Sequence, residues 1–228
     1  MIGVGLALPL LLLVITGLPL QFTVPLGLGS SGVPFGWVHQ AYGIAAPPSM
    51  RVSADVVQLG DQIFFGPQHV RVTEDLIGVL RIDALRIVVT GNEVMLNVDD
   101  PEIPLERGPL PGYAERVGID DEGLLHLDTV DGTYTSDDLG ASWWPAELAR
   151  TNPTLNWAEL EIATPGKAQA LRFGAANLSW ERFLQDLHSG RFFGPVGVWV
   201  MNLASLLFVV LGFTGLILWS STRRKRRQ

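Results

Sequence analysis

The chain has no cysteine among its 228 residues. This absence excludes a disulfide framework, a thiolate nucleophile, cysteine-ligated zinc and iron–sulfur clusters. Acidic residues are absent from both ends, because all 23 Asp and Glu lie between residues 24 and 195, together with 11 of the 16 Lys and Arg. The central segment therefore has a net charge of −12. That charge argues against nucleic acid as a partner and keeps the segment off an anionic lipid surface.

Motifs for catalysis are also missing. The sequence has no nucleophile elbow, no phosphate-binding loop and no pair of carboxylates in a recognisable catalytic frame. Its four histidines, at positions 39, 69, 126 and 188, lie outside the two long apolar runs, and no two have the spacing of a metal pair. We therefore expect no catalytic residues and no metal site, and a protein that is not an enzyme.

What the sequence does have is a long apolar run at its C-terminal end. Residues 196–219 contain no ionisable side chain, and 14 of these 24 residues are Val, Leu, Ile or Phe. A helix of this length reaches about 36 Å, enough to cross the ~30 Å hydrocarbon core of a bilayer. Five basic residues follow at 223–227 and predict that the C-terminus lies in the cytoplasm.

Residues 1–23 form a second uncharged stretch. A cleaved signal peptide is the competing interpretation, but the stretch has no basic n-region, exceeds the usual apolar length and shows no small-x-small site after Leu20. We favour a retained transmembrane helix. Thr16-Gly17 closes this run and Thr214-Gly215 closes the other, and small residues at such points predict close helix packing rather than a ligand site.

Between the two expected transmembrane segments the sequence changes to short runs in which apolar and polar residues alternate. Glycine- and proline-rich chain follows the first span, and from Arg51 onward strands of four to eleven residues are separated by turn signals such as Thr90-Gly91-Asn92. The longest expected runs are 52–59 and 79–89, and residues 99–112, with four prolines, are expected to be a loop. This pattern predicts an antiparallel meander.

One helix is expected outside the membrane. Trp180, Phe183, Leu184 and Leu187 lie at helical spacing between a Ser179 N-cap and Gly190, so this amphipathic helix is expected in the outer interface. Aromatic side chains near the membrane boundaries are the expected interfacial anchors. They are Trp37, Trp180, Phe183, Phe192, Phe193, Trp199 and Trp219.

A single hairpin motif stands out in the central segment. Ser136, Asp138, Gly140 and Trp143 fit the S-x-D-x-G-x-[S/T]-W pattern of an Asp-box, in which the Asp accepts hydrogen bonds from turn amides and the Trp packs beneath. A propeller would need the motif repeated, and it occurs once. We interpret it as a structural turn rather than a glycan site.

The segment DLHSGRFFG at 186–194, the Gly-x-Trp that follows and the span ending in Thr214-Gly215-Leu216 resemble the PepSY-associated transmembrane helix family. LALPLLLLVITG near the N-terminus is similar to the first helix of that family. The resemblance implies a bacterial inner-membrane protein with a periplasmic domain. Larger relatives have four spans and include proteins linked to reduction of iron–siderophore complexes through haem held by helix histidines. This chain has two apolar runs without histidine and no clear PepSY domain.

The expected fold is therefore a membrane protein with two antiparallel transmembrane α-helices, an antiparallel β-rich periplasmic domain and a short amphipathic interfacial helix. The expected divisions are a transmembrane helix over 1–23, an irregular linker over 24–50, the β-rich domain over 51–177, the amphipathic helix over 178–194, a second transmembrane helix over 195–220 and a basic cytoplasmic tail over 221–228.

Three functions stay open. The first is a non-catalytic accessory or assembly subunit without a cofactor, in the bacterial inner membrane with both termini cytoplasmic, docking on a larger membrane or periplasmic complex. The second is an electron-transfer protein with haem b at His188, aided by His39 or a partner's histidine. Against that second function, His188 is also well placed as a simple polar residue at a helix C-terminus. A third, weaker hypothesis is a sensor or assembly factor that binds a metal or a peptide on the β domain.

Overall fold

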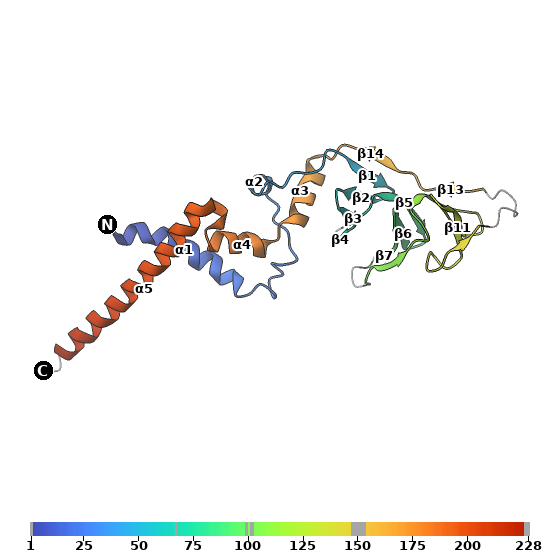
Figure 1. Ribbon diagram of the computed structural model, residues 1–228. Coiled ribbons are helices and arrows are strands. Elements are labelled where there is room, and N and C mark those ends of the chain that lie inside the picture. The colour runs from blue at the N-terminus through green and yellow to red at the C-terminus, as the bar shows by residue number, and fades with distance from the viewer. Residues whose placement is uncertain (1, 67, 99, 101–102, 147–153, 226–228) are drawn as a thin grey trace. The chain divides into compact units, whose positions relative to one another are not determined.

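The computed structural model describes residues 2–66, 68–98, 100, 103–146 and 154–225 (Figure 1). The chain divides into two compact units, one formed by residues 1–44 with 174–228 and the other by residues 45–173. We call the first the helical unit and the second the β unit, and each is described by itself.

The helical unit is built from both ends of the chain. Its elements are α1 (Ile2–Leu20), α2 (Gly36–Ala41), the last turn of α3 (Lys167–Asn177), α4 (Trp180–His188), the 3₁₀ turn η1 (Arg191–Phe193) and α5 (Gly194–Lys225). Val33, Val38, Leu178 and Phe183 form its buried core. The expected helix after Ser179 is therefore present as α4.

Two helices were missed by the sequence analysis. Residues 24–50 were expected to be irregular, yet α2 forms within them, because Val38 and His39 are buried in the helical unit. Residues 167–177 were expected to belong to the β domain, yet they form α3. The alanine-rich sequence of α3 has high helix propensity but only a weak apolar stripe, so periodicity did not reveal it.

One helix is long and apolar enough to cross a membrane. The stretch Arg191–Ser220, which is η1 with most of α5, spans 30 residues, and α1 offers a shorter apolar stretch, Ala7–Leu20, among the residues whose side chains are described. Most side chains of α5 are exposed to the surroundings of the helix. The expected span near the C-terminus thus has the required length and composition.

The β unit consists of three antiparallel meanders of four strands each. The first contains β1 (Met50–Ser53), β2 (Val56–Leu59), β3 (Gln62–Phe65) and β4 (Gln68–Arg71). The second contains β5 (Leu76–Ile82), β6 (Leu85–Thr90), β7 (Glu93–Val98) and β8 (Glu106–Pro109). The third contains β9 (Ala114–Ile119), β10 (Leu125–Thr129), β11 (Gly132–Ser136) and β12 (Trp144–Pro145). The prediction of an antiparallel meander is confirmed.

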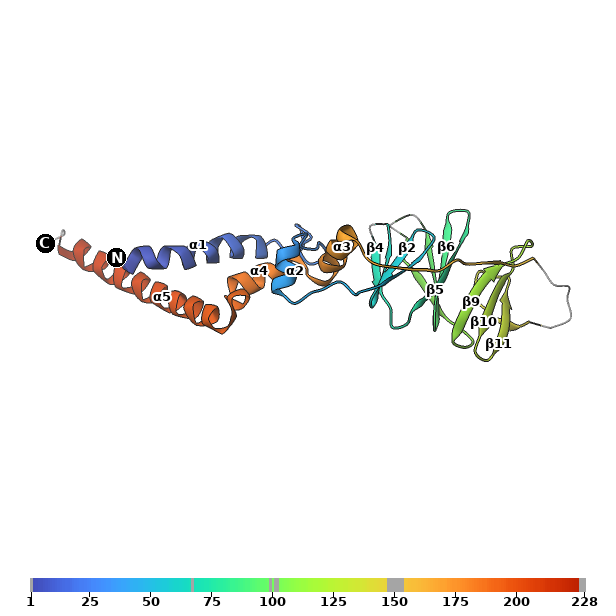
Figure 2. The same ribbon diagram turned by 90° about the horizontal axis from the view of Figure 1, so that it is seen from above.

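The chain then returns across the first strand of every meander (Figure 2). β13 (Asn156–Trp157) pairs with β9, and β14 (Glu161–Ala163) pairs with β1. Between them Ala158 packs against Gly78 of β5, and the Ser53 hydroxyl donates to the Glu159 carbonyl at 2.7 Å. The returning segment therefore ties the three sheets together along one side.

Three details of the strand prediction were wrong. The runs 52–59 and 79–89 are each two strands, separated by two-residue turns at Ala54-Asp55 and at Asp83-Ala84. Ala54 and Asp83 adopt φ of 51° and 52°, which a glycine usually signals, so these turns gave no recognisable pattern. The expected proline-rich loop at 99–112 contains β8.

Candidate functional site

The candidate site lies in the helical unit, where α4 meets α1. α4 begins with the expected cap, because the Ser179 hydroxyl accepts from the N–H of Arg182 at 3.3 Å. The N–H groups of Trp180 and Glu181 donate to the carbonyls of Ser31 and Leu28, both at 3.0 Å. The loop after α1 thus satisfies the unpaired donors of the first turn of α4 and holds that helix in place.

His188 ends α4 and lies against α1. Its Nδ1 is 2.9 Å from the hydroxyl oxygen of Thr16, and a Cβ added at Gly17 would lie 3.0 Å from its Cε1. The Thr16 side chain is 1% exposed. The two residues expected to pack against a second transmembrane helix therefore receive the imidazole of His188, and we call Thr16, Gly17 and His188 the histidine joint.

The hydrogen bonds of the histidine joint define the tautomer of the ring. The Thr16 hydroxyl donates its one hydrogen to the Leu12 carbonyl at 2.6 Å, so toward His188 it can only accept. Nδ1 must then carry the proton. In the neutral ring Nε2 keeps its lone pair, and no described residue donates to it.

A tight turn connects the histidine joint to α5. Gly190 has φ of 77°, and a Cβ there would lie 2.5 Å from the Gly197 carbonyl oxygen, while a Cβ at Gly197 would clash with the Gly190 carbonyl. The two glycines let the chain turn back on the first turns of α5. The GRFFG part of the 186–194 segment is therefore explained by backbone geometry.

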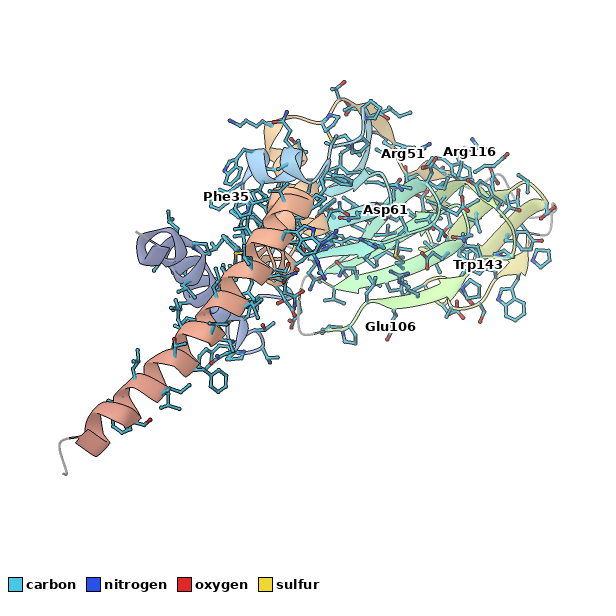
Figure 3. The ribbon with its side chains drawn as sticks, turned by 60° about the vertical axis from the view of Figure 1, so that its left-hand side comes forward. Phe35, Arg51, Asp61, Glu106, Arg116 and Trp143 are labelled. Atoms are coloured by element: carbon cyan, nitrogen blue, oxygen red, sulfur yellow. The ribbon has the colours of Figure 1, made fainter. Side chains whose placement is uncertain are left out.

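Aromatic side chains form a closed cycle of contacts that includes Phe192 of this turn. Phe35, Trp37, Phe192, Phe183 and Trp180 contact one another in that order, with centroids 5.6 to 6.5 Å apart, and Trp180 returns to Phe35. Figure 3 labels Phe35, next to α2. Of the expected anchors, Phe183 is buried inside this cluster, whereas Trp37, Phe193, Trp199 and Trp219 are exposed.

Tyr42 contacts two residues of α4. The Tyr42 hydroxyl donates to Asp186 at 2.9 Å, and the Arg182 guanidinium lies 5.8 Å from the Tyr42 ring. Burial and the hydrogen bond to Asp186 raise the pKa of Tyr42 above its ordinary value. Because the hydroxyl stays protonated, this contact persists across the physiological pH range.

Thr214 and Gly215, the second pair of residues expected to pack against a helix, have no partner on another helix among the described residues. A Cβ at Gly215 would meet nothing within 4 Å, and the Thr214 hydroxyl donates to the Val210 carbonyl of its own helix at 2.9 Å. Helix packing at Thr214 and Gly215 therefore stays a prediction that another chain would have to fulfil.

The other histidines have structural partners. The buried His39 donates from Nε2 to the Val33 carbonyl at 2.7 Å and packs on Gly174, so it has no free face for a ligand. His69 stacks on Phe64, and His126 donates from Nε2 to Asp120 at 2.9 Å. Within the described ranges, no three His, Asp or Glu side chains are grouped to bind a metal.

The carboxylate of Asp120 organises a turn of the β unit. Asp120 accepts from the N–H groups of Glu122 and Leu124 as well as from His126. Burial opposes the ionisation of Asp120, but these hydrogen bonds outweigh it, and the pKa of the carboxyl lies below its ordinary value.

The Asp-box residues form a hydrogen-bonded turn between β11 and β12. The N–H of Ser142 donates to Asp138 and the N–H of Gly140 donates to the Ser136 hydroxyl, each at 2.8 Å, and Gly140 has φ of 92°. Trp143 packs against the core beneath (Figure 3). The hydrogen bonds from Ser142 and Ser136 lower the pKa of Asp138.

An apolar helix of bilayer length, in a helical unit built from both ends of the chain, indicates a membrane protein that also contains an antiparallel β unit. The family model of the PepSY-associated TM region matches residues 1–223, and the chain belongs to that family. No curated protein and no solved structure matches the chain.

Sequence reasoning singled out Thr16, Gly17 and His188 but did not bring them together. Thr16 and His188 are 172 positions apart, and no periodic pattern relates residues at that separation. The Gly190–Gly197 contact and the Tyr42–Asp186 hydrogen bond were also missed. The one available signal was the density of glycine around 186–197.

Proposed function

We propose that the protein is a non-catalytic accessory subunit of the bacterial inner membrane. In this proposal α1 and α5 both span the bilayer, the two termini are cytoplasmic, and the β unit lies in the periplasm and docks on a larger complex. The observation that carries the proposal is the histidine joint, because it makes α1 an integral part of the folded helical unit.

The histidine joint supports retention of α1. A cleaved signal peptide has no lasting packing partner, whereas Thr16 is buried against His188 and α1 contacts both α4 and α5. The 19 residues of α1 rise about 28 Å, close to the thickness of the hydrocarbon core. α1 and α5 together would then anchor the chain at both ends.

Exposed apolar side chains on the third meander support docking. Val130, Tyr113 and Trp144 are 61%, 45% and 58% exposed, and the N–H of Val130 donates to the Tyr113 carbonyl, which places these two residues at the same end of the sheet. Exposed aromatic residues are enriched at protein interfaces. The net charge of −12 between residues 24 and 195 favours a partner with a basic surface.

The test is site-specific photo-cross-linking in native membranes followed by purification in mild detergent. A photo-reactive residue at Val130 should give a reproducible adduct with one other protein, and the same residue at Asp83, an exposed turn of another meander, should not. A chain that purifies alone, with no adduct at Val130, would contradict the proposal.

A second candidate function is electron transfer with haem b at His188. The tautomer supports it, because a ligating histidine usually donates its other ring N–H to a neighbouring acceptor, as Nδ1 does to Thr16. His39 does not fit as the second ligand, since its Nε2 is held by Val33. The chain's own residues would hold haem from one side, and haem would supply one-electron transfer.

An absorbance spectrum of the purified protein decides this candidate. A Soret band that is present in the native chain and absent from His188→Ala would support it. Thr16→Val should leave the Soret band in place but shift the reduction potential of the haem, because the imidazole of His188 loses its hydrogen-bond acceptor. A spectrum without a Soret band, after growth with added haem, would end it.

A further inference from the structure

Asn202 is the one side-chain amide in the apolar part of α5. The hydroxyls of the neighbouring polar residues are satisfied within the helix, since Ser205 donates to the Met201 carbonyl and Thr214 to the Val210 carbonyl. Asn202 is exposed, and among the described residues its amide has no hydrogen-bond partner. An amide has two donors and an acceptor, and all of them stay open here.

An amide without hydrogen-bond partners is costly in free energy at the depth that Asn202 would have in a membrane. Asn202 lies six residues beyond Val196, which corresponds to about 9 Å along the helix, and three residues beyond Trp199. The hydrocarbon region offers no water to an exposed amide. Asn side chains in spanning helices therefore hydrogen-bond across to another helix.

The face that carries Asn202 is uncovered along its length. The residues that share this face at alternating spacings of three and four are Asn202, Ser205, Val209, Gly212 and Leu216. All five are exposed, and a Cβ at Gly212 would meet nothing within 4 Å. The side of α5 that contacts the chain's own helical unit carries Met201 and Ala204 instead. Figures 1 and 3 show the second half of α5 extending past α1 without a described neighbour.

We propose that this face binds α5 of a second copy of the chain in a parallel dimer. Two copies inserted with the same topology bring Asn202 to the same depth, and a two-fold axis along the membrane normal sets the two amides opposite each other. A carboxamide is self-complementary because each copy supplies a donor and an acceptor. Ser205 and Gly212 on the same face let the two backbones approach closely, and the 3.5-residue spacing fits a left-handed crossing.

The absence of cysteine from the chain gives a clean test. Single cysteines replace Ser205, Val209 or Leu216 on the proposed face, in the full chain in native membranes. The control positions are Leu203, Val210 and Ile217, which are turned about 100° away from Asn202, Val209 and Leu216. Because a disulfide needs Cα atoms within about 7 Å, mild oxidation should cross-link the first set into dimers and leave the second set monomeric. Equal cross-linking of both sets would overturn the proposal.

A matched pair of variants then tests the amide. Purified full-length chain is labelled with a fluorescent donor or acceptor and reconstituted at low density into phosphatidylethanolamine–phosphatidylglycerol vesicles. Asn202→Leu should weaken energy transfer between copies about threefold to tenfold at equal density, while Leu203→Ala, at a control position, should leave it unchanged. Energy transfer that survives Asn202→Leu would overturn the inference.

The dimer depends on α5 crossing the bilayer but not on the accessory role. Vesicles contain no other protein, so dimerisation there stands even if no adduct forms at Val130. Cross-links from Ser205, Val209 and Leu216 to a different protein, with no energy transfer in vesicles, would assign the face to that protein and overturn the second copy.

Discussion

The hydroxyl of Thr16 is the acceptor that orients His188. Thr16→Val keeps the shape of the side chain but removes this acceptor and leaves Nδ1–H without a partner, so we expect the helical unit to lose about 1 to 2 kcal/mol of stability. Thr16→Ser keeps the hydroxyl and should cost well under half of that. Thermal unfolding in detergent, followed by protease resistance, measures both variants.

The same pair of variants reports on the tautomer. Nitrogen-15 spectra of histidine-labelled protein should show a His188 ring protonated at Nδ1 in the native chain and in Thr16→Ser. In Thr16→Val the protonation preference should relax toward Nε2. A native ring protonated at Nε2 would contradict the assigned hydrogen bond and remove the structural support for ligation at that atom.

The Asp120 carboxylate links the turn after β9 to His126 on β10. Its pKa is lower in the folded chain than in the unfolded chain, so the carboxylate stabilises the fold above the unfolded pKa, near 4. That contribution is lost as pH falls through the folded pKa. Asp120→Asn should therefore destabilise the β unit by about 1 kcal/mol at pH 7 and have a smaller effect below pH 3.

Urea unfolding of the full chain, followed by tryptophan fluorescence between pH 7 and 3, checks this expectation. Asp121→Asn is the matched control, because Asp121 is an exposed neighbour whose side chain makes no described contact. An Asp120→Asn variant whose stability deficit stays constant down to pH 3 would show that the carboxylate charge is not the cause.

At the scale of elements, the turn between α4 and α5 depends on two glycines with different requirements. Gly190 and Gly194 have φ of 77° and 73°, but a Cβ at Gly190 meets the Gly197 carbonyl whereas a Cβ at Gly194 meets nothing. Gly194→Ala should cost about 1 to 3 kcal/mol for the backbone alone, because φ of 73° with ψ of −165° is a conformation that essentially only glycine adopts. Gly190→Ala should cost about 2 to 4 kcal/mol, because the backbone strain and the clash add.

Both variants strain the backbone, but only Gly190→Ala also creates a clash with a neighbouring segment. Protease resistance of the purified chain gives the ranking without requiring a reversible unfolding curve. A Gly190→Ala variant as resistant to protease as the native chain would show that the approach of residue 190 to Gly197 does not contribute to the fold of the helical unit.

Elements whose formation depends on residues close together in the sequence could be predicted. α4 was predicted because its apolar spacing and its Ser179 cap lie within ten residues, and the Asp-box turn because its hydrogen bonds join residues two to four apart. The turns at Ala54 and Asp83 could not be predicted, because residues other than glycine adopt the left-handed conformation there.

Contacts between distant segments could not be predicted from the sequence either, because no local pattern relates residues so far apart. The return of β13 and β14 to the first strands, and the contact of Thr16 with His188, have no periodic or turn signal. α2 and α3 form because the fold buries part of them, which is a property of the whole unit. The candidate site was thus found as separate residues, and only the folded chain unites them.

For the whole molecule, the uneven distribution of charge along the chain is the strongest constraint on its orientation in the membrane. All 23 acidic residues lie between residues 24 and 195, while five basic residues at 223–227 follow α5 directly. Basic segments next to a span remain in the cytoplasm, so the tail should stay inside and the β unit should be outside. If α1 also spans the bilayer, the N-terminus returns to the cytoplasm.

A labelling experiment tests this topology, again using the cysteine-free chain. A membrane-impermeant maleimide should label Asp121→Cys in intact spheroplasts, because that residue is exposed on the β unit. A cysteine added after Gln228 should react only once detergent opens the membrane. The reverse pattern would contradict the orientation, and an intact mass that begins near residue 24 would contradict retention of α1. Since Thr16 would leave with α1, such cleavage would also deprive His188 of its acceptor, whereas a reversed orientation would leave the histidine joint intact.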